Sequence, residues 1–383
     1  MTSAPRDHPL LIVNADDYGL TEGVSRAILR AHTDGIITST SVLTLAPGFD
    51  RSVGWLADHP SLGTGAHLAA VGEDPPLLTA REVPTLVDRR GRMHYSWRQF
   101  LPLAAARRID PDDLRREFSA QLDLLLGAGV AVDHLDTHQN IHLWPMVRDV
   151  VLELGEARGV KVIRVTRSTA ASVVGQTVRR LAAQLEATLD QRGWAYADAS
   201  TGLDEAGNLD TPAMVRALDR LAGTGAKTAE LASHPGGHND PVRHRYHWNY
   251  SWGGELDALC SVEVRTAIDR QGWQLGTFAD LADRIARNGP AETNPPDPVP
   301  AGPKLAPSNG RVANPMSTNP TDPTPAPGRP AVVAAATRNP QTTVRDDDNG
   351  NTSDSKTSNN ADTADNAPKP DGAARPTTPG KPA

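Results

Sequence analysis

Residues 11–24, LIVNADDYGLTEGV, decide the fold class of this chain of 383 residues. The apolar run at residues 10–13 is typical of a buried strand in a parallel sheet. Thr21 is a favourable helix N-cap, and apolar residues recur after it at the spacing of one helical face. The stretch therefore predicts a strand followed by a helix, with polar residues at the turn that joins them.

The same alternation of apolar runs and helical patterns continues to about residue 289. Further strands are predicted at residues 36–45, 62–68, 130–137, 160–165 and 228–233. Further helices are predicted at residues 110–127, 145–158, 211–221, 261–270 and 277–287. Strands that alternate with helices in this way indicate an α/β protein, built either as a parallel barrel or as a doubly wound sheet.

Two stretches, residues 72–110 and 235–254, interrupt this alternation with loops that contain several aromatic residues. Aromatic side chains on loops above the mouth of a barrel are suitable platforms for sugar rings. They could equally form a small core within the loop itself. The sequence leaves both interpretations open.

The C-terminal part of the chain differs sharply in composition from the rest. Phe278 is the last aromatic residue, and 19 of the 32 prolines lie in residues 290–383. Such a segment cannot bury enough apolar surface to offset the entropy that folding would cost. We therefore predict one folded domain over residues 1–289 and a disordered tail over residues 290–383.

Composition also excludes several classes of protein. The single cysteine, Cys260, excludes a disulfide framework and a cysteine-ligated zinc site. No apolar run approaches the roughly 18–20 residues needed to span a bilayer, and residues 1–9 lack the apolar core of a secretory signal. We therefore predict a cytoplasmic protein without a membrane span. The net charge of −7 provides no basic field for nucleic acid.

Polar side chains stand at the downstream ends of four predicted strands. In barrels and open α/β sheets, ligands bind at the carboxyl ends of the strands, so these side chains are candidates for a single site. They are Asn14, Asp16 and Asp17; His67; Asp133, His134, Asp136, His138 and His142; and Ser233 with His234.

The histidine-rich segment gives the strongest indication of metal chemistry. It places His134, His138 and His142 within nine residues. Two imidazoles and a carboxylate bind a metal while leaving positions on the ion for water and substrate. A loop of hydrogen-bonded histidines is the alternative. His67, alone on its strand, could likewise be a buried core residue.

The aspartate pair and the last histidine could supply further groups for the reaction. Adjacent carboxylates on an extended strand point to opposite sides, so one of Asp16 and Asp17 could bind a metal while the turn that follows redirects the other. Capping of the next helix is the alternative. Pro235 confines His234 to extended geometry, from which it could donate a proton to a leaving group.

Six stretches resemble the YdjC-like carbohydrate deacetylase family, and together they span nearly all of residues 10–285. The opening run and the histidine segment are the most specific of them. The stretches are LIVNADDYGLTEGV (11–24), GIITSTSVL (35–43), GAHL (65–68), HLDTHQNIHLWP (134–145), IRVTR (163–167) and ELASHPGG (230–237).

The resemblance implies an irregular, TIM-like (β/α) barrel with a divalent metal at its mouth, usually magnesium, with zinc or manganese as alternatives. Matched by position, Asp17, His67 and His138 would bind the metal. Asp16 would be the general base and His234 the general acid. The implied reaction is hydrolysis of the N-acetyl group of an amino sugar or glycoconjugate. The family also makes a homodimer plausible.

One position departs from the family pattern, since Asn140 stands where relatives commonly have the middle of three histidines. The implied metal ligand His138 is retained, so the departure concerns hydrogen bonding around the metal or contact with substrate. Arg164, in another predicted strand, could orient a carboxylate of the site or form a surface ion pair.

Two other functions remain compatible with these residues. Another metal-dependent hydrolase, for example one acting on a phosphoester, would use the same ligands, although the four clusters carry no surplus of Lys or Arg for a phosphate. A non-catalytic sugar-binding protein on the same scaffold is the second alternative. The presence of Asp16 and His234 argues against it, because binding alone needs neither a base nor an acid.

Overall fold

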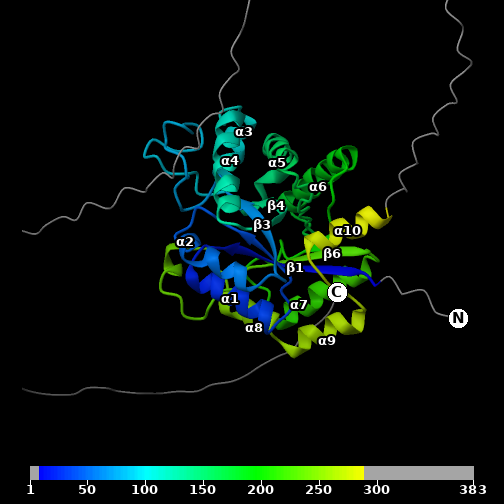
Figure 1. The fold of residues 1–383 in the computed structure, drawn as a ribbon. Helices are drawn as coiled ribbons and strands as arrows, with labels where there is room; N and C mark the ends of the chain where they lie inside the picture. Colours follow the sequence, from blue (N-terminus) through cyan, green and yellow to red (C-terminus); the bar gives the residue numbers. More distant parts are fainter. Residues whose placement is uncertain (1–7, 289–383) are drawn as a thin grey trace, which may run out of the picture. The chain divides into compact units, whose positions relative to one another are not determined.

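A parallel sheet forms the centre of the structure, a computed structural model that describes residues 8–288 (Figure 1). The strand order is β4-β3-β2-β1-β6-β5, with β7 paired to β1, and each of these pairs is parallel. The strands are β1 (Leu10–Tyr18), β2 (Ser39–Val42), β3 (Gly63–Leu68), β4 (Val132–Thr137), β5 (Ala199–Thr201), β6 (Thr228–Ser233) and β7 (Gln274–Leu275). The predicted α/β class is confirmed.

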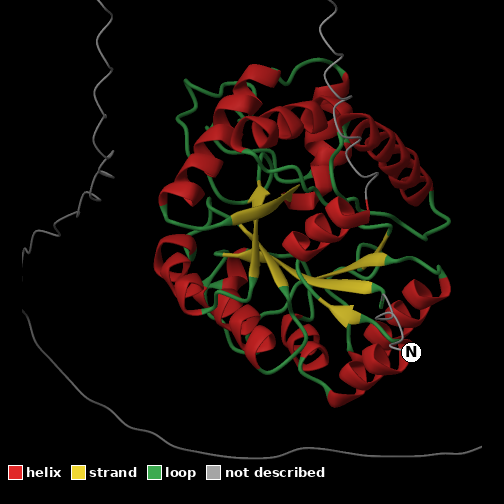
Figure 2. Ribbon diagram, turned by 45° about the vertical axis from the view of Figure 1, so that its right-hand side comes forward, coloured by secondary structure: helices red, strands yellow, loops and turns green. Residues whose placement is uncertain are grey.

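Helices lie on the outside of the sheet, which curls so that its strands occupy the middle of the fold (Figure 2). In this arrangement β1 has neighbours on both sides, and all nine of its residues are buried. The helices are α1 (Glu22–Thr33), α2 (Phe49–Ser52), α3 (Trp97–Ala105), α4 (Pro111–Gly127), α5 (Pro145–Arg158), α6 (Val173–Arg192), α7 (Thr211–Gly223), α8 (Trp252–Leu259), α9 (Val262–Gln271) and α10 (Phe278–Asn288). Short 3-10 segments are η1 (Val53–Asp58), η2 (His138–Leu143) and η3 (Arg243–Arg245).

Helix starts follow the predicted capping residues closely. Thr21 accepts a hydrogen bond from the backbone N–H of Val24, and α1 begins at the next residue. Asp110 caps α4 in the same way. The helix α7 begins at Thr211 as predicted, and Asp210 caps it by accepting a hydrogen bond from the backbone N–H of Ala213.

The predicted barrel is correct only in part, because the sheet is curled but does not form a complete TIM barrel within residues 8–288. The expected strand at residues 160–165 was wrong. That segment makes only single bridges, from Ile163 to Leu135 and from Val162 to Ala195. Its backbone is hydrogen-bonded to Leu135 on one side and to Ala195 on the other, and the carbonyl of Arg164 also accepts from Nε2 of His142 at 3.1 Å.

The two stretches expected to be loops contain helices that the sequence pattern conceals. Residues 72–110 include α3, which has Pro102 inside it, and residues 235–254 run into α8, which has two glycines in its first turn. Both features lower intrinsic helix propensity. The helix α6 was likewise not predicted. These elements are held by packing on the sheet rather than by local preference.

Two predictions lie outside the described residues. They are the end of the folded domain near residue 289 and the disorder of residues 290–383. Within residues 8–288, no helix combines the length and the apolar character that crossing a membrane requires.

Candidate active site and metal centre

A β-bulge at the end of β1 places both aspartates of the pair in one cavity. Ala15 pairs with Thr40 and Tyr18 with Val42, so β1 carries one more residue than β2 across this interval. Asp17 adopts the left-handed region, with φ of 68°, a conformation that aspartate tolerates better than most residues. One of the two carboxylates was expected to be redirected by the turn that follows. The bulge itself breaks the alternation of the strand, and both carboxylates line the cavity.

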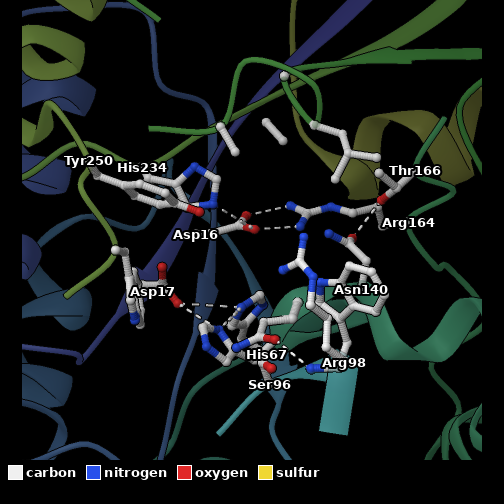
Figure 3. A pocket seen from close by; sticks show the side chains of 18 of the residues that line it. Asp16, Asp17, His67, Ser96, Arg98, Asn140, Arg164, Thr166, His234 and Tyr250 are labelled. Carbon is white, nitrogen blue, oxygen red and sulfur yellow. Dashed lines mark hydrogen bonds and ion pairs between the residues drawn. The ribbon is translucent and has the colours of Figure 1, made fainter. Parts of the chain in front are cut away.

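The cavity has a volume of about 410 Å³ and lies at the carboxyl ends of the strands. It brings together one or more residues from each of the four predicted clusters (Figure 3). Asp16, Asp17, His67 and His138 are buried in its wall, and His234 is mostly buried. The cavity is also lined by Arg164, Asn140, Thr166, Trp97, Trp248 and Tyr250, among others.

Three of these side chains converge as a metal site would require. Oδ1 of Asp17 lies 3.3 Å from Nδ1 of His138 and 3.5 Å from Nε2 of His67, and the two imidazole nitrogens are 3.3 Å apart. Ligands roughly 2.1 Å from one ion have about these separations from one another. Oδ1 of Asp17 is also buried without a hydrogen-bond partner, so the donor set fits a divalent cation.

A second carboxylate orients one of the imidazoles. Nδ1 of His67 donates to Oδ1 of Asp136 at 2.7 Å, which leaves Nε2 facing the other two candidate ligands. Burial alone would lower the pKa of His67, but Asp136 and the aspartate pair raise it to about 9. Burial would raise the pKa of Asp17, but the two imidazoles lower it to about 2. The carboxylates around His67 therefore favour a positive charge at this position, which a divalent cation would also supply.

Arg164 links three buried carboxylates, and the surface ion pair that was one alternative for it is wrong. It is 1% exposed. Its guanidinium donates to both oxygens of Asp16 at 2.6 and 2.7 Å, to Glu230 at 2.7 Å, and lies 2.9 Å from Asp136. Burial alone would raise the pKa of Asp16, but Arg164 outweighs it and lowers the pKa. Asp16 is therefore ionised near neutral pH.

One oxygen of Asp16 retains capacity to accept a proton. Oδ1 accepts from Arg164 and from the Asn14 amide at 2.9 Å, whereas Oδ2 accepts from Arg164 alone. Oδ2 also lies 3.7 Å from Nε2 of His234. Figure 3 shows Asp16 between Arg164 and His234, with Asp17 and His67 below them in the view.

We expect replacement of Arg164 to destabilise the protein more than replacement of an exposed arginine. Arg164→Met leaves buried carboxylates without their cation and should cost about 3–5 kcal/mol. Arg92→Met removes an ion pair with Asp88 whose arginine is 66% exposed and should cost about 0–1 kcal/mol. Urea unfolding of both variants measures the difference, and equal losses would contradict the structural role given to Arg164.

His234 is positioned by its backbone and by an aromatic neighbour. Its N–H donates to Glu255 at 2.5 Å, and its ring lies edge-on to Tyr250 with 5.1 Å between centroids. Nδ1 is buried without a partner. Its other ring nitrogen, Nε2, is the one near Asp16.

The other two histidines of the predicted cluster are hydrogen-bonded core residues. His134 pairs with Asp133 at 2.6 Å and stacks on Phe278. His142 accepts from the hydroxyl of Thr137 at 2.9 Å, and burial lowers its pKa to about 4. Of the three histidines His134, His138 and His142, only His138 therefore lies where it could bind a metal.

The aromatic residues of 235–254 divide between the two interpretations left open above. Tyr246 and Trp252 are buried and pack with their neighbours as a small core. Trp248 and Tyr250 line the cavity. Trp248 is fixed there by a hydrogen bond from Nε1 to Glu73 at 2.7 Å.

Sequence reasoning missed several residues that organise the site. Asp136 belonged to one of the four predicted clusters, but no role was assigned to it. Glu230 and Glu255 were assigned no role because they lie inside a strand and a helix. A charged residue within an otherwise apolar strand such as β6, TAELAS, is the signal that was available for Glu230.

The fold and the site together define an α/β protein with a candidate metal centre at the carboxyl ends of its strands. The model of the YdjC-like protein family matches residues 10–270, and the chain belongs to this family. A carbohydrate deacetylase of Brevibacillus brevis is 28% identical over 271 residues, which are 71% of this chain and 99% of that protein. A chitooligosaccharide deacetylase of Proteus mirabilis is 27% identical over 273 residues, 71% and 98% of the two chains.

A solved structure from Enterococcus faecalis V583, provisionally described as a cellobiose-phosphate cleavage protein, has the same fold. Its TM-score to this chain is 0.60 at 24% identity, and the match covers 72% of this chain and 99% of that one.

Proposed function

We propose that the protein is a metal-dependent carbohydrate deacetylase that hydrolyses the N-acetyl group of an amino sugar or glycoconjugate. The observation that carries the proposal is the convergence of Asp17, His67 and His138 on one point, beside Asp16 and His234. The relatives named as deacetylases support the reaction and the class of substrate.

Asp17, His67 and His138 would hold the divalent ion. When bound, such an ion polarises the amide carbonyl and lowers the pKa of a water molecule. Magnesium stays a prediction, because two imidazoles with one carboxylate also suit zinc or manganese. The homodimer likewise stays a prediction.

Asp16 and His234 would move the protons of the reaction. Oδ2 of Asp16 accepts a proton from the water that attacks the acetyl carbon, while Arg164 keeps the carboxylate ionised and fixed in orientation. Nε2 of His234 donates a proton to the departing nitrogen as the C–N bond breaks. The products are acetate and the free amine.

The decisive experiment measures free acetate from a panel of N-acetylated sugars with purified full-length protein, before and after metal is removed by a chelator. We expect release to fall to the uncatalysed level with chelator and to return when one divalent metal is added back. Metal bound per chain is counted in the same samples.

Two results would reject the proposal. Acetate release that persists at zero bound metal would show that the ion has no part in the reaction. Absence of release from the whole panel, with metal bound and with the sugars shown to bind, would favour the non-catalytic sugar-binding alternative.

A further inference from the structure

A second cavity, called here the apolar groove, adjoins the cavity of the metal centre. It has a volume of about 360 Å³ and lies between α3, η2 and the first turns of α6. Its walls are mainly apolar and include Leu101, Leu143, Trp144, Val173, Val178 and Leu181. This composition differs from that of the neighbouring cavity, where carboxylates, imidazoles and a guanidinium dominate.

The groove offers no unpaired charge to a ligand. Among the residues that line it, all within the described range, the charged one is Asp204. Its carboxylate already accepts hydrogen bonds from the hydroxyl of Ser168 and the backbone N–H of Thr169, both at 2.6 Å, and from the N–H of Ala170 at 3.1 Å. A charged ligand would lose its water there without gaining a partner of opposite charge, so the mainly apolar groove favours an apolar ligand.

The two cavities share a wall that hydrogen bonds hold in place. Trp97, Gln139, Asn140 and Leu203 line both of them. The side chain of Asn140 accepts from the hydroxyl of Thr166 at 2.6 Å, and that of Gln139 accepts from the backbone N–H of Trp97 at 2.9 Å. The two cavities therefore lie side by side, which is the arrangement that a molecule with one polar and one apolar part requires.

We propose that the groove binds an apolar aglycone carried by the N-acetylated sugar, so that the substrate is an amphiphilic glycoside. The inference rests on the proposed function. Val173 and Val174, which are 80% and 49% exposed at the start of α6, line the groove without a covering partner. An alkyl chain would cover such side chains and gain from leaving water.

The first test compares two substrates that differ only in the aglycone, methyl and n-octyl 2-acetamido-2-deoxy-β-glucoside, each below its micelle concentration. With metal-loaded, full-length protein we expect kcat/KM for acetate release to be at least tenfold higher for the octyl glycoside, since roughly two newly buried methylenes suffice for that ratio. Equal values for the two glycosides would overturn the inference while leaving the deacetylase proposal standing.

Variants locate the preference in the groove. Val178→Asp places a charge in the apolar wall, and Val174→Asp does so at a half-exposed position that folding tolerates. Both should lower kcat/KM for the octyl glycoside and so bring the octyl to methyl ratio close to one. Ala183→Asp introduces the same charge at an exposed position of α6 that does not line the groove, and it should keep the ratio of the unmodified protein.

A binding measurement separates this inference from the activity. Trp97 and Trp144 line the groove, so tryptophan fluorescence should change when the octyl glycoside is added. With Val174→Asp, the concentration of glycoside needed for the same change should be at least tenfold higher. The same fluorescence result is expected even if the protein releases no acetate. Absence of the fluorescence change would overturn the inference. A change in sedimentation of the full-length chain with Val174→Asp would also overturn it, because the groove would then be a contact between copies of the chain.

Discussion

Asp16→Asn should lower kcat for acetate release by about a thousandfold while the protein still binds one metal ion per chain. The amide cannot accept the proton that Oδ2 of Asp16 takes in the proposed reaction. Asp16 is not one of the proposed ligands Asp17, His67 and His138. It forms a second group that could hold an ion, with His67 and Asp136, but the Arg164 guanidinium already contacts both of those carboxylates. The measurement is kcat with saturating metal, together with the metal content of the same preparation.

The stability of this variant has to be measured beside its activity. Asp16 holds two of the hydrogen bonds of Arg164, so the substitution also weakens a buried ion-pair network. The values of kcat are therefore compared only under conditions in which urea unfolding shows that the variant is still folded. If kcat falls less than tenfold under these conditions, Asp16 is not the general base.

Asp17→Asn, one residue further along β1, should have a different primary effect. It removes the carboxylate that two imidazoles face at 3.3 and 3.5 Å. We expect metal affinity to fall at least a hundredfold, and activity at low metal concentration to disappear. Excess metal should restore part of the activity, which it cannot do for Asp16→Asn.

Asp133→Asn is the matched control for this prediction. Asp133 also pairs with a histidine, at 2.6 Å, but neither residue lines the cavity. Calorimetric titration with metal should give the same affinity for this variant as for the unmodified protein. An affinity that survives in Asp17→Asn would exclude Asp17 as a ligand.

The position of the site could be predicted from the sequence, because it depends on local patterns. An apolar run followed at once by polar residues marks the carboxyl end of a parallel strand, and four such ends meet at one edge of the sheet. That reasoning placed Asp16, His67, His138 and His234 near one another, and the structure brings all of them into one cavity.

The internal connections of the site could not be predicted, because they join residues far apart in the chain. Arg164 contacts Asp16 across 148 positions and Glu230 across 66. No periodicity marks such pairs. The irregular barrel was predicted correctly only in part for a tertiary reason: the segment after Val160 pairs with Leu135 and Ala195 through single bridges and does not extend into a full strand.

The bulge in β1 makes the site depend on the length of the strand as well as on its residues. Asp16 and Asp17 share one side of the sheet only because β1 has one residue more than β2 there. Inserting one residue between Asp16 and Asp17 would change this register and turn a carboxylate away from the cavity, although both aspartates would be kept. A single insertion at this point would therefore disrupt the candidate metal centre without changing any of its residues.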